Sequence, residues 1–202
     1  MHPDATFDDA VAFHGHACPG LAIGYRVARA AMARLESDRP ADEELVAVVQ
    51  NDSCAVDAVQ LVCGCTFGKG NLVFLDHGKH AYTFHCRSTG RGVRLYAEPF
   101  YLDDADDPRL VELFRKDSLT PAERKEKAQI MDRRIQRILT VPEEEFLRVA
   151  APRHGLPEQA RVFDSIRCEA CGERVMATRI REQTGRTLCR ECMSASQPPT
   201  PA

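Results

Sequence analysis

This sequence has no long apolar run, no basic and apolar leader segment, and no excess of either sign of charge. A helix that spans a membrane needs ~20 consecutive apolar residues, so we expect no such helix. Residues 1–16 lack both the basic and the apolar region of a secretory signal peptide, which predicts a cytoplasmic protein. The net charge of −3, with both signs interspersed, indicates neither nucleic acid nor a membrane surface as a partner.

Cysteine is what the sequence does have. The chain has 202 residues, 44% of them hydrophobic, which is enough for one ordinary domain and a small appendage. Nine of the residues are cysteines, and an odd number would leave one thiol outside any set of disulfides. In a reducing cytoplasm they indicate metal ligands or reactive thiols. Four lie in the last 35 residues, and five precede Arg87.

Hydrophobic periodicity and capping signals predict an α+β core. Helices are expected at residues 19–36, about 53–62, 107–114 and 120–139 and from residue 142 onward, and strands at 45–50, 72–76, 81–86 and 93–98. Pro19 at the first position of its helix makes Cys18 the expected N-cap. The order helix–strand–helix–strand–strand–strand predicts an antiparallel sheet packed with helices.

The composition also predicts domain boundaries. We expect a core domain over residues 1–150, a linker over 151–164, a small zinc-binding domain over 165–193 and a disordered tail over 194–202.

The C-terminal cysteines form two CxxC pairs. Cys168 and Cys171 are separated by 17 residues from Cys189 and Cys192, the spacing of a structural zinc site. About thirty residues cannot bury enough surface to fold alone, so bound zinc would supply the folding energy. A redox-active CxxC, or two fortuitous pairs, is the alternative. Because four thiolates leave no open coordination position, we predict a structural zinc ion.

The sequence of the small zinc-binding domain, called the finger below, does not show what kind of molecule it contacts. Four arginines lie between the two pairs: Arg174, Arg179, Arg181 and Arg186. This basic bias is compatible with nucleic acid, but Glu173 and Glu182 oppose it and no aromatic side chain is present for base stacking. Contact with a protein is at least as well supported.

The stretch FHGHACPGL offers a second set of ligands. If the segment is extended, His14 and His16 point the same way and Cys18 continues the alternation. As an N-cap, Cys18 would lie at the positive end of a helix dipole, which lowers a thiol pKa. These three side chains suit Zn²⁺, Fe²⁺, Ni²⁺ or copper. Alternatively, the histidines cap the helix or bond locally, and Cys18 fills the core.

More chemistry-bearing residues follow the first strand. Cys54 and Asp57 share one helix face, and Cys65 opens a loop in which Thr66, Lys69 and Asn71 could hold an anion. The loop lacks the residue order of a P-loop, and a plain turn between strands explains it equally well. His85 lies inside a predicted strand, where a packed or surface histidine is commoner than a ligand.

Two long motifs and the finger resemble the FmdE family, which is named for a gene of the molybdenum formylmethanofuran dehydrogenase operon. The motifs are FHGHACPGLAIGYRVARAAM and DSCAVDAVQLVCGCTFGKGNL, and the finger pattern is C-x₂-C-G…C-x₂-C. The resemblance covers about residues 7–150 and 165–192. It implies an α+β core domain, an intertwined homodimer and, in some members, an added treble-clef zinc finger.

The resemblance also implies a pocket that binds a metal in the core. The family's motif falls on His14, His16, Cys18, Cys54, Asp57, Gln60, Cys65, Thr66, Lys69 and Asn71. Two departures stand out. Cys63 adds a cysteine before Gly64, and a proline-rich tail cuts short the helix that begins at CREC.

We therefore predict a metal-binding accessory protein, related by family to molybdenum- or tungsten-dependent formyl or formate oxidoreductases. The core would hold a divalent ion of zinc, nickel or iron. His16 and Cys54 are the first expected ligands, followed by His14, Cys18 and Cys65.

Two other functions stay open. In an enzyme, Cys18 or Cys65 would be the nucleophile, His14 or His16 the base, and Asp57 the carboxylate that orients it, while Lys69 holds an anionic substrate. In a regulator, the core would sense a metal or redox state and the finger would contact nucleic acid or RNA polymerase. The balanced charge argues against strong binding of nucleic acid.

Overall fold

A five-stranded sheet with helices on one face forms the first of two units in the computed structural model. The structure describes residues 5–37, 40–98, 107–183 and 185–194, and the chain divides into units 1–159 and 160–202. The first unit contains α1 (Phe7–His14), α2 (Pro19–Leu35), β1 (Leu45–Val49), α3 (Ala55–Cys63), β2 (Leu72–Phe74), β3 (Ala81–Cys86), β4 (Gly92–Ala97), α4 (Pro108–Arg115), α5 (Pro121–Thr140), α6 (Glu143–Phe146) and β5 (Leu147–Ala150). The predicted α+β class is confirmed.

The strand order in the sheet is β2-β1-β3-β4-β5, and only the β1–β2 pair is parallel. The sequence predicted that residues 72–76 would be followed directly by an antiparallel partner at 81–86. Instead, the chain leaves β1, forms α3 and returns beside β1 as β2, with Val48 opposite Val73. β3 then pairs with the other edge of β1, so the sheet is mixed.

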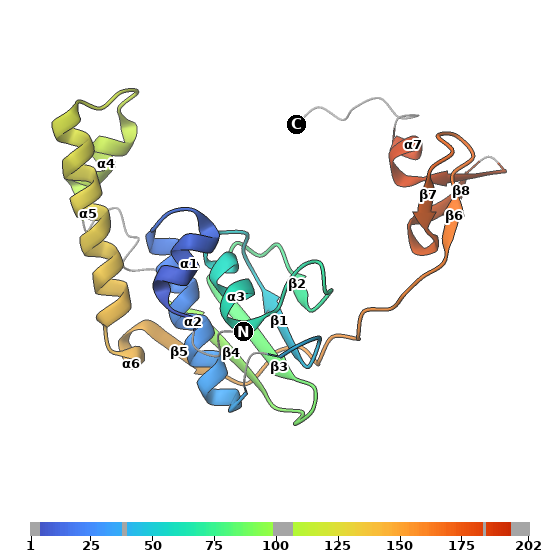
Figure 1. Cartoon of the computed structure of the whole chain (residues 1–202), viewed down its shortest axis with the longest axis horizontal. Coiled ribbons are helices and arrows are strands. Elements are labelled where there is room, and N and C mark those ends of the chain that lie inside the picture. Colours follow the sequence, from blue (N-terminus) through green and yellow to red (C-terminus); the bar gives the residue numbers. More distant parts are fainter. Residues whose placement is uncertain (1–4, 38–39, 99–106, 184, 195–202) are drawn as a thin grey trace. The chain divides into compact units, whose positions relative to one another are not determined.

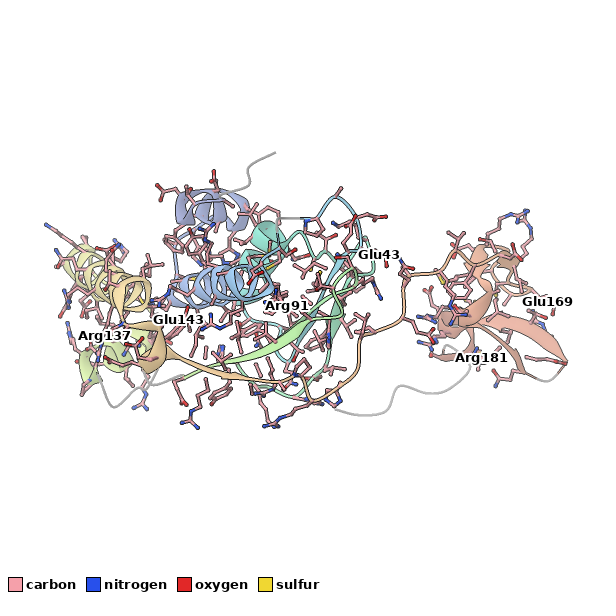
Figure 2. The ribbon with its side chains drawn as sticks, turned by 90° about the horizontal axis from the view of Figure 1, so that it is seen from below. Glu43, Arg91, Arg137, Glu143, Glu169 and Arg181 are labelled. Atoms are coloured by element: carbon pink, nitrogen blue, oxygen red, sulfur yellow. The ribbon has the colours of Figure 1, made fainter. Side chains whose placement is uncertain are left out.

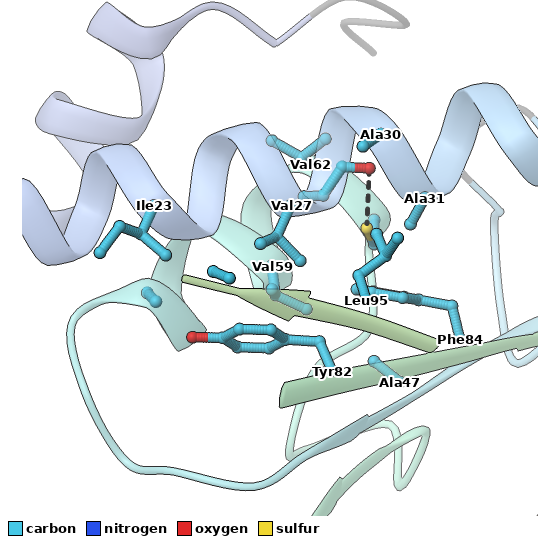
Figure 3. Packing of buried hydrophobic residues seen from close by; sticks show 14 of the residues in the cluster. Ile23, Val27, Ala30, Ala31, Ala47, Val59, Val62, Tyr82, Phe84 and Leu95 are labelled. Atoms are coloured by element: carbon cyan, nitrogen blue, oxygen red, sulfur yellow. Dashed lines mark hydrogen bonds between the residues drawn. The ribbon is translucent and has the colours of Figure 1, made fainter. Parts of the chain in front are cut away.

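α2 supplies the main layer over the sheet (Figure 1). Its buried stripe includes Ile23 and Val27, which pack with Tyr82 and Phe84 of β3 and Leu95 of β4 (Figure 3). Since successive strand residues point to opposite faces, the side chains that alternate with these core residues lie on the other face of the sheet.

Close approach of α2 and α3 depends on a glycine. A Cβ atom placed on Gly24 would lie 2.1 Å from the carbonyl oxygen of Ala55. No other residue fits there, and the contact holds the start of α3 against α2. This brings Cys54, the N-cap of α3, toward the start of α2.

The helix predicted from Pro142 onward is wrong over most of its length. Only Glu143–Phe146 is helical, and Leu147–Ala150 forms β5 as the edge strand beside β4. The pairing of Leu147 with Ala97 and of Ala150 with Arg94 connects segments about fifty residues apart. The residues around Pro142 favour a helix locally, and nothing in that stretch indicates that it pairs with β4.

α4 and α5 form a helical hairpin that extends from the sheet (Figure 1). The α5 helix begins at a capping box within the range predicted for it, and the Thr120 hydroxyl accepts from the Glu123 N–H there. Its C-terminal end packs on α2, where Arg26 donates to the carbonyl of Ile138 over 2.7 Å. Nearby, Glu143, labelled in Figure 2, pairs with Arg34.

The second unit is small and built from hairpins. It contains β6 (Ser165–Arg167), β7 (Arg174–Met176), the 3-10 helix η3 (Ala177–Arg179), β8 (Ile180–Gln183), β9 (Arg186–Cys189) and α7 (Arg190–Ser194). β6 pairs with β7, and β8 pairs with β9. Ser194, the first residue of the predicted disordered tail, ends α7, and the rest of that tail lies outside the described residues. Among the helices that the structure describes, none is long and apolar enough to cross a membrane.

Candidate metal centres

The HxHxC motif is not extended, so the condition under which the sequence aligned His14, His16 and Cys18 is not met. His14 is the last residue of α1, a helix capped by Thr6 and Asp9. Gly15 then adopts φ 96°, and its N–H donates to the Val11 carbonyl over 2.8 Å. His14 and His16 thus lie on either side of a left-handed glycine, in a bend and not in a strand.

His14 has a fixed orientation. Its Nδ1 lies 2.7 Å from Oδ2 of Asp57 on α3, and its side chain is 11% exposed. A carboxylate can only accept a hydrogen bond, so Nδ1 carries the proton. The lone pair of a neutral His14 is therefore on Nε2, which lies 3.9 Å from the Cys18 thiol. A carboxylate behind the distal nitrogen is the usual arrangement of a ligating histidine.

Three potential ligands converge at this point. One ligand atom each from His14, His16 and Cys18 lies within 4.8 Å of the others, and the two imidazole rings are 4.5 Å apart. Around a tetrahedral zinc ion, ligand atoms would be roughly 3.3–3.8 Å apart. Small side-chain rotations would bring the three atoms to that spacing.

Cys18 is the N-cap of α2, as predicted, and its sulfur accepts from the Leu21 N–H over 3.3 Å. The predicted lowering of its thiol pKa is wrong, however. Burial raises the pKa of Cys18 and the neighbouring thiol of Cys54 raises it further, although the Leu21 N–H opposes both effects. A bound cation would reverse this balance, since a coordinating thiol loses its proton.

Cys54 and Cys65 lie in different surroundings. A Cβ atom placed on Gly20 would be 3.3 Å from Cβ of Cys54 and 3.9 Å from the Cys18 sulfur, so Cys54 borders the cluster without belonging to the three converging ligands. Cys65 is fully buried in the main core and donates to the carbonyl of Leu45.

The predicted anion loop is held by the protein's own groups. Asn71, fully buried, accepts from the Thr66 N–H and donates to the Leu45 carbonyl. The ammonium of Lys69 donates to the Asp42 carbonyl over 3.2 Å. These bonds are typical of a structural turn, and anion binding there stays a prediction.

Gln60 ties this loop to the cluster. Its amide nitrogen donates to Oδ1 of Asp57 over 3.3 Å, and its oxygen accepts from the Phe67 N–H over 3.5 Å. Gln60 thus connects the Asp57 carboxylate, which orients His14, to the loop at Phe67.

The four finger cysteines form the second cluster. The sulfur atoms of Cys168, Cys171, Cys189 and Cys192 lie within 4.8 Å of one another. The Cys189 N–H donates to the Cys168 sulfur over 3.3 Å, and the Cys192 N–H donates to the Cys189 sulfur over 3.4 Å. Backbone N–H groups, chiefly that of Cys171, lower the pKa of Cys168 to about 6. The lowered pKa favours the thiolate form of Cys168, which is the form in which cysteine binds zinc.

Sequence reasoning did not predict α1, which positions His14. The available signal was Thr6 followed three residues later by Asp9, whose side chain accepts from the Thr6 N–H as in a capping box. The contact between His14 and Asp57 joins residues 43 positions apart, and no local pattern specifies it.

The chain is similar to a protein of known sequence and to a protein of known structure. A probable S-adenosyl-L-methionine-binding protein of Archaeoglobus fulgidus is 35% identical over 188 residues, which are 89% of this chain and 50% of that protein. The chain thus spans about half the length of this relative. The crystal structure of a tungsten formylmethanofuran dehydrogenase FmdE-like protein from Syntrophus aciditrophicus matches with a TM-score of 0.58 and 26% identity, covering 96% of this chain and 95% of that one.

The family model described as "FmdE, Molybdenum formylmethanofuran dehydrogenase operon" matches residues 13–148. This range begins one residue before His14 and includes Cys18, Cys54 and Asp57. The resemblance read from the sequence motifs is therefore confirmed, and the chain belongs to the FmdE family.

Proposed function

We propose that this protein is a metal-binding accessory protein, with a divalent ion in the core and a structural zinc ion in the finger. The observation that carries the proposal is the arrangement around His14. Asp57 holds Nδ1, Nε2 is directed to Cys18, and His16 completes a set of three ligand atoms within 4.8 Å. The core ion would be zinc, nickel or iron, with Cys54 as the nearest candidate for a fourth ligand and Cys65 a more distant one.

The partner of this accessory protein would be a molybdenum or tungsten oxidoreductase of the formylmethanofuran or formate dehydrogenase type. The support is the operon for which the family is named and the tungsten enzyme in the description of the related structure. We further propose a cytoplasmic homodimer with the predicted domain boundaries at residues 150, 164 and 193. Binding of S-adenosyl-L-methionine is not part of the proposal, because half of the relative so named lies outside the match.

The finger would be a treble clef that contacts protein. Cys168 and Cys171 lie at the β6–β7 turn, whereas Cys189 ends β9 and Cys192 lies in α7. A ligand pair at the start of a terminal helix favours a treble clef over a ribbon of two identical knuckles. Arg181 and Arg186 donate to backbone carbonyls of the finger itself, which leaves fewer N–H donors for phosphate contacts.

Metal analysis of purified variants tests the two sites separately. We expect about two ions per wild-type chain, and about one in either Cys168→Ser or His16→Ala. The double variant should bind none. The control is His77→Ala, which removes an exposed histidine outside both clusters and should still bind two ions. If Cys168→Ser binds no zinc, nickel or iron when loaded with each, the core site is refuted.

A Cys–His–Asp enzyme is the second candidate, because Cys18, His14 and Asp57 are linked in that order by 3.9 Å and 2.7 Å contacts. Against it, nucleophilic cysteines have a lowered pKa, whereas burial raises that of Cys18.

The rate at which Cys18 is alkylated distinguishes an enzyme from a metal site. In an enzyme, Cys18 would react with iodoacetamide faster than the other core cysteines near neutral pH. In a metal site, it would react slowly, and added metal would protect it further.

A further inference from the structure

The face of the sheet opposite α2 carries a cluster of positive charge. In β4, Val93, Leu95 and Ala97 belong to the main core, so Arg94 and Tyr96 lie on the opposite face. The register of β5 places Ala150 beside Arg94 and Arg148 beside Tyr96. Arg94, Tyr96 and Arg148 lie on the face opposite α2, and none of them belongs to the His14 cluster.

A cavity of about 470 Å³ opens on this face. Its charged and aromatic lining consists of Lys79, Arg94, Tyr96, Glu98, Arg148 and Arg153. Four of these side chains are cationic and one is anionic, and Glu98 already pairs with Arg148. The volume lies within the range of small-molecule sites.

Arg94 is a buried cation of this lining with an unsatisfied donor. It is only 6% exposed, and its Nε has no hydrogen-bond partner in the part of the chain that the structure describes. A buried charge is costly unless it is paired and hydrogen-bonded. Burial and the charge of Arg153 both lower the pKa of Arg94, which places two guanidinium groups near each other.

Nothing within the described ranges neutralises this excess. Lys79, Arg94 and Arg153 form no ion pair with any described residue, and the one carboxylate in the cavity is paired with Arg148. An anion in the cavity would give Nε of Arg94 a partner that the described residues do not supply. It would also relieve the repulsion between Arg94 and Arg153.

We propose that this cavity binds a small organic anion carrying a carboxylate or a phosphate group. Arg94 would bind the anionic group from the floor of the cavity, and Arg153 and Lys79 would bind it from the rim. Guanidinium groups recognise both kinds of anion through paired N–H donors. The Tyr96 ring, next to Arg148, would contact the apolar part of the ligand.

Titration of the full-length protein with inorganic phosphate and with succinate tests this site. We expect saturable binding, measured by calorimetry, of at least one of the two probes, and the tighter one identifies the anionic group. Arg94→Gln should weaken that binding by about tenfold or more, and the exposed Arg153→Gln by about threefold. Arg133→Gln removes an exposed charge on α5 and should leave affinity within about twofold of wild type.

Three results would overturn the proposal. One is the absence of saturable binding of either probe at concentrations up to tens of millimolar. Another is an equal loss in Arg133→Gln and Arg153→Gln, because binding would then reflect net charge alone. The third is a change of oligomeric state in Arg153→Glu without any anion binding, since a second copy of the chain would then cover the cavity. Because Arg153 is exposed, its variants stay informative even if Arg94→Gln fails to fold.

Discussion

The carboxylate of Asp57 decides which nitrogen of His14 can bind a metal. It lies 2.7 Å from Nδ1, and that contact leaves Nε2 directed at Cys18. Without the charge, the imidazole could rotate or carry its proton on Nε2, and the ligand set would lose one member part of the time.

Asp57→Asn should therefore weaken metal binding in the core by about 10- to 100-fold without unfolding the protein. The affinity can be measured by competition with a chromophoric chelator in a Cys168→Ser background, so that the finger contributes no signal. Asp132→Asn, an exposed position on α5, is the matched control and should not change the affinity. An unchanged affinity in Asp57→Asn would remove the reason for assigning His14 as a ligand.

The pKa values of two histidines, His85 in β3 and His80 just before that strand, determine how we expect stability to depend on pH. Burial lowers the pKa of His80 and of His85 below the ordinary value of 6.5, and the charge of Arg87 lowers that of His85 further. The folded state thus favours the neutral imidazoles, while the unfolded chain binds protons from about pH 6.5 downward. Their contribution is complete above that pH and is lost progressively as the pH falls toward the lowered values.

Urea unfolding at about pH 7.5 and about pH 5.5 measures this effect. The free energy of unfolding should fall between the two conditions, and a His80→Gln, His85→Gln double variant should show a smaller fall. A wild-type protein that became more stable on acidification in this window would contradict the assignment.

Among the elements, the contact between α2 and α3 sets the geometry of the core site, because it places Cys54 and Asp57 against the start of α2. Gly24→Ala should destabilise the fold by about 1–3 kcal/mol or more, since its methyl group would collide with the backbone of Ala55. Gly68→Ala is the control, because a Cβ atom there would meet nothing within 4 Å and should change stability by less than ~0.5 kcal/mol. Chemical denaturation of both variants measures the difference. Equal stability of the two would mean that the helices can separate at little cost.

Local sequence signals predicted the elements that have local causes. Pro19 and the Thr120 capping box located the starts of α2 and α5, and a β-branched run located β1. Elements defined by distant partners were missed. β5 exists because it pairs with β4, and the edge position of β2 depends on the return of the chain after α3. The same limit applies to the site, where the ligand types were evident but the turn at Gly15 was not.

At the scale of the whole molecule, the two units depend on different forces. The core of the first contains more than twenty buried apolar residues, including Tyr82, Phe84 and Phe146. The buried core of the second consists of Cys168, Ile180, Leu188 and Cys189, so half of it is made of proposed metal ligands. Burial of apolar surface can stabilise the first unit by itself, whereas we expect the second to need the proposed zinc ion in order to fold.

Chelation should therefore unfold residues 165–194 and leave the sheet of the first unit folded. In hydrogen exchange followed by mass spectrometry, a strong zinc chelator should abolish amide protection in β8 and β9 but not in β3 and β4. Cys189→Ser should lose the same protection without chelator, and Cys86→Ser, a buried cysteine of β3 outside both clusters, should keep it. If both units lost protection together, the sheet would also depend on bound metal. If the β8–β9 hairpin stayed protected, its few apolar contacts would suffice and the four cysteines would need another explanation.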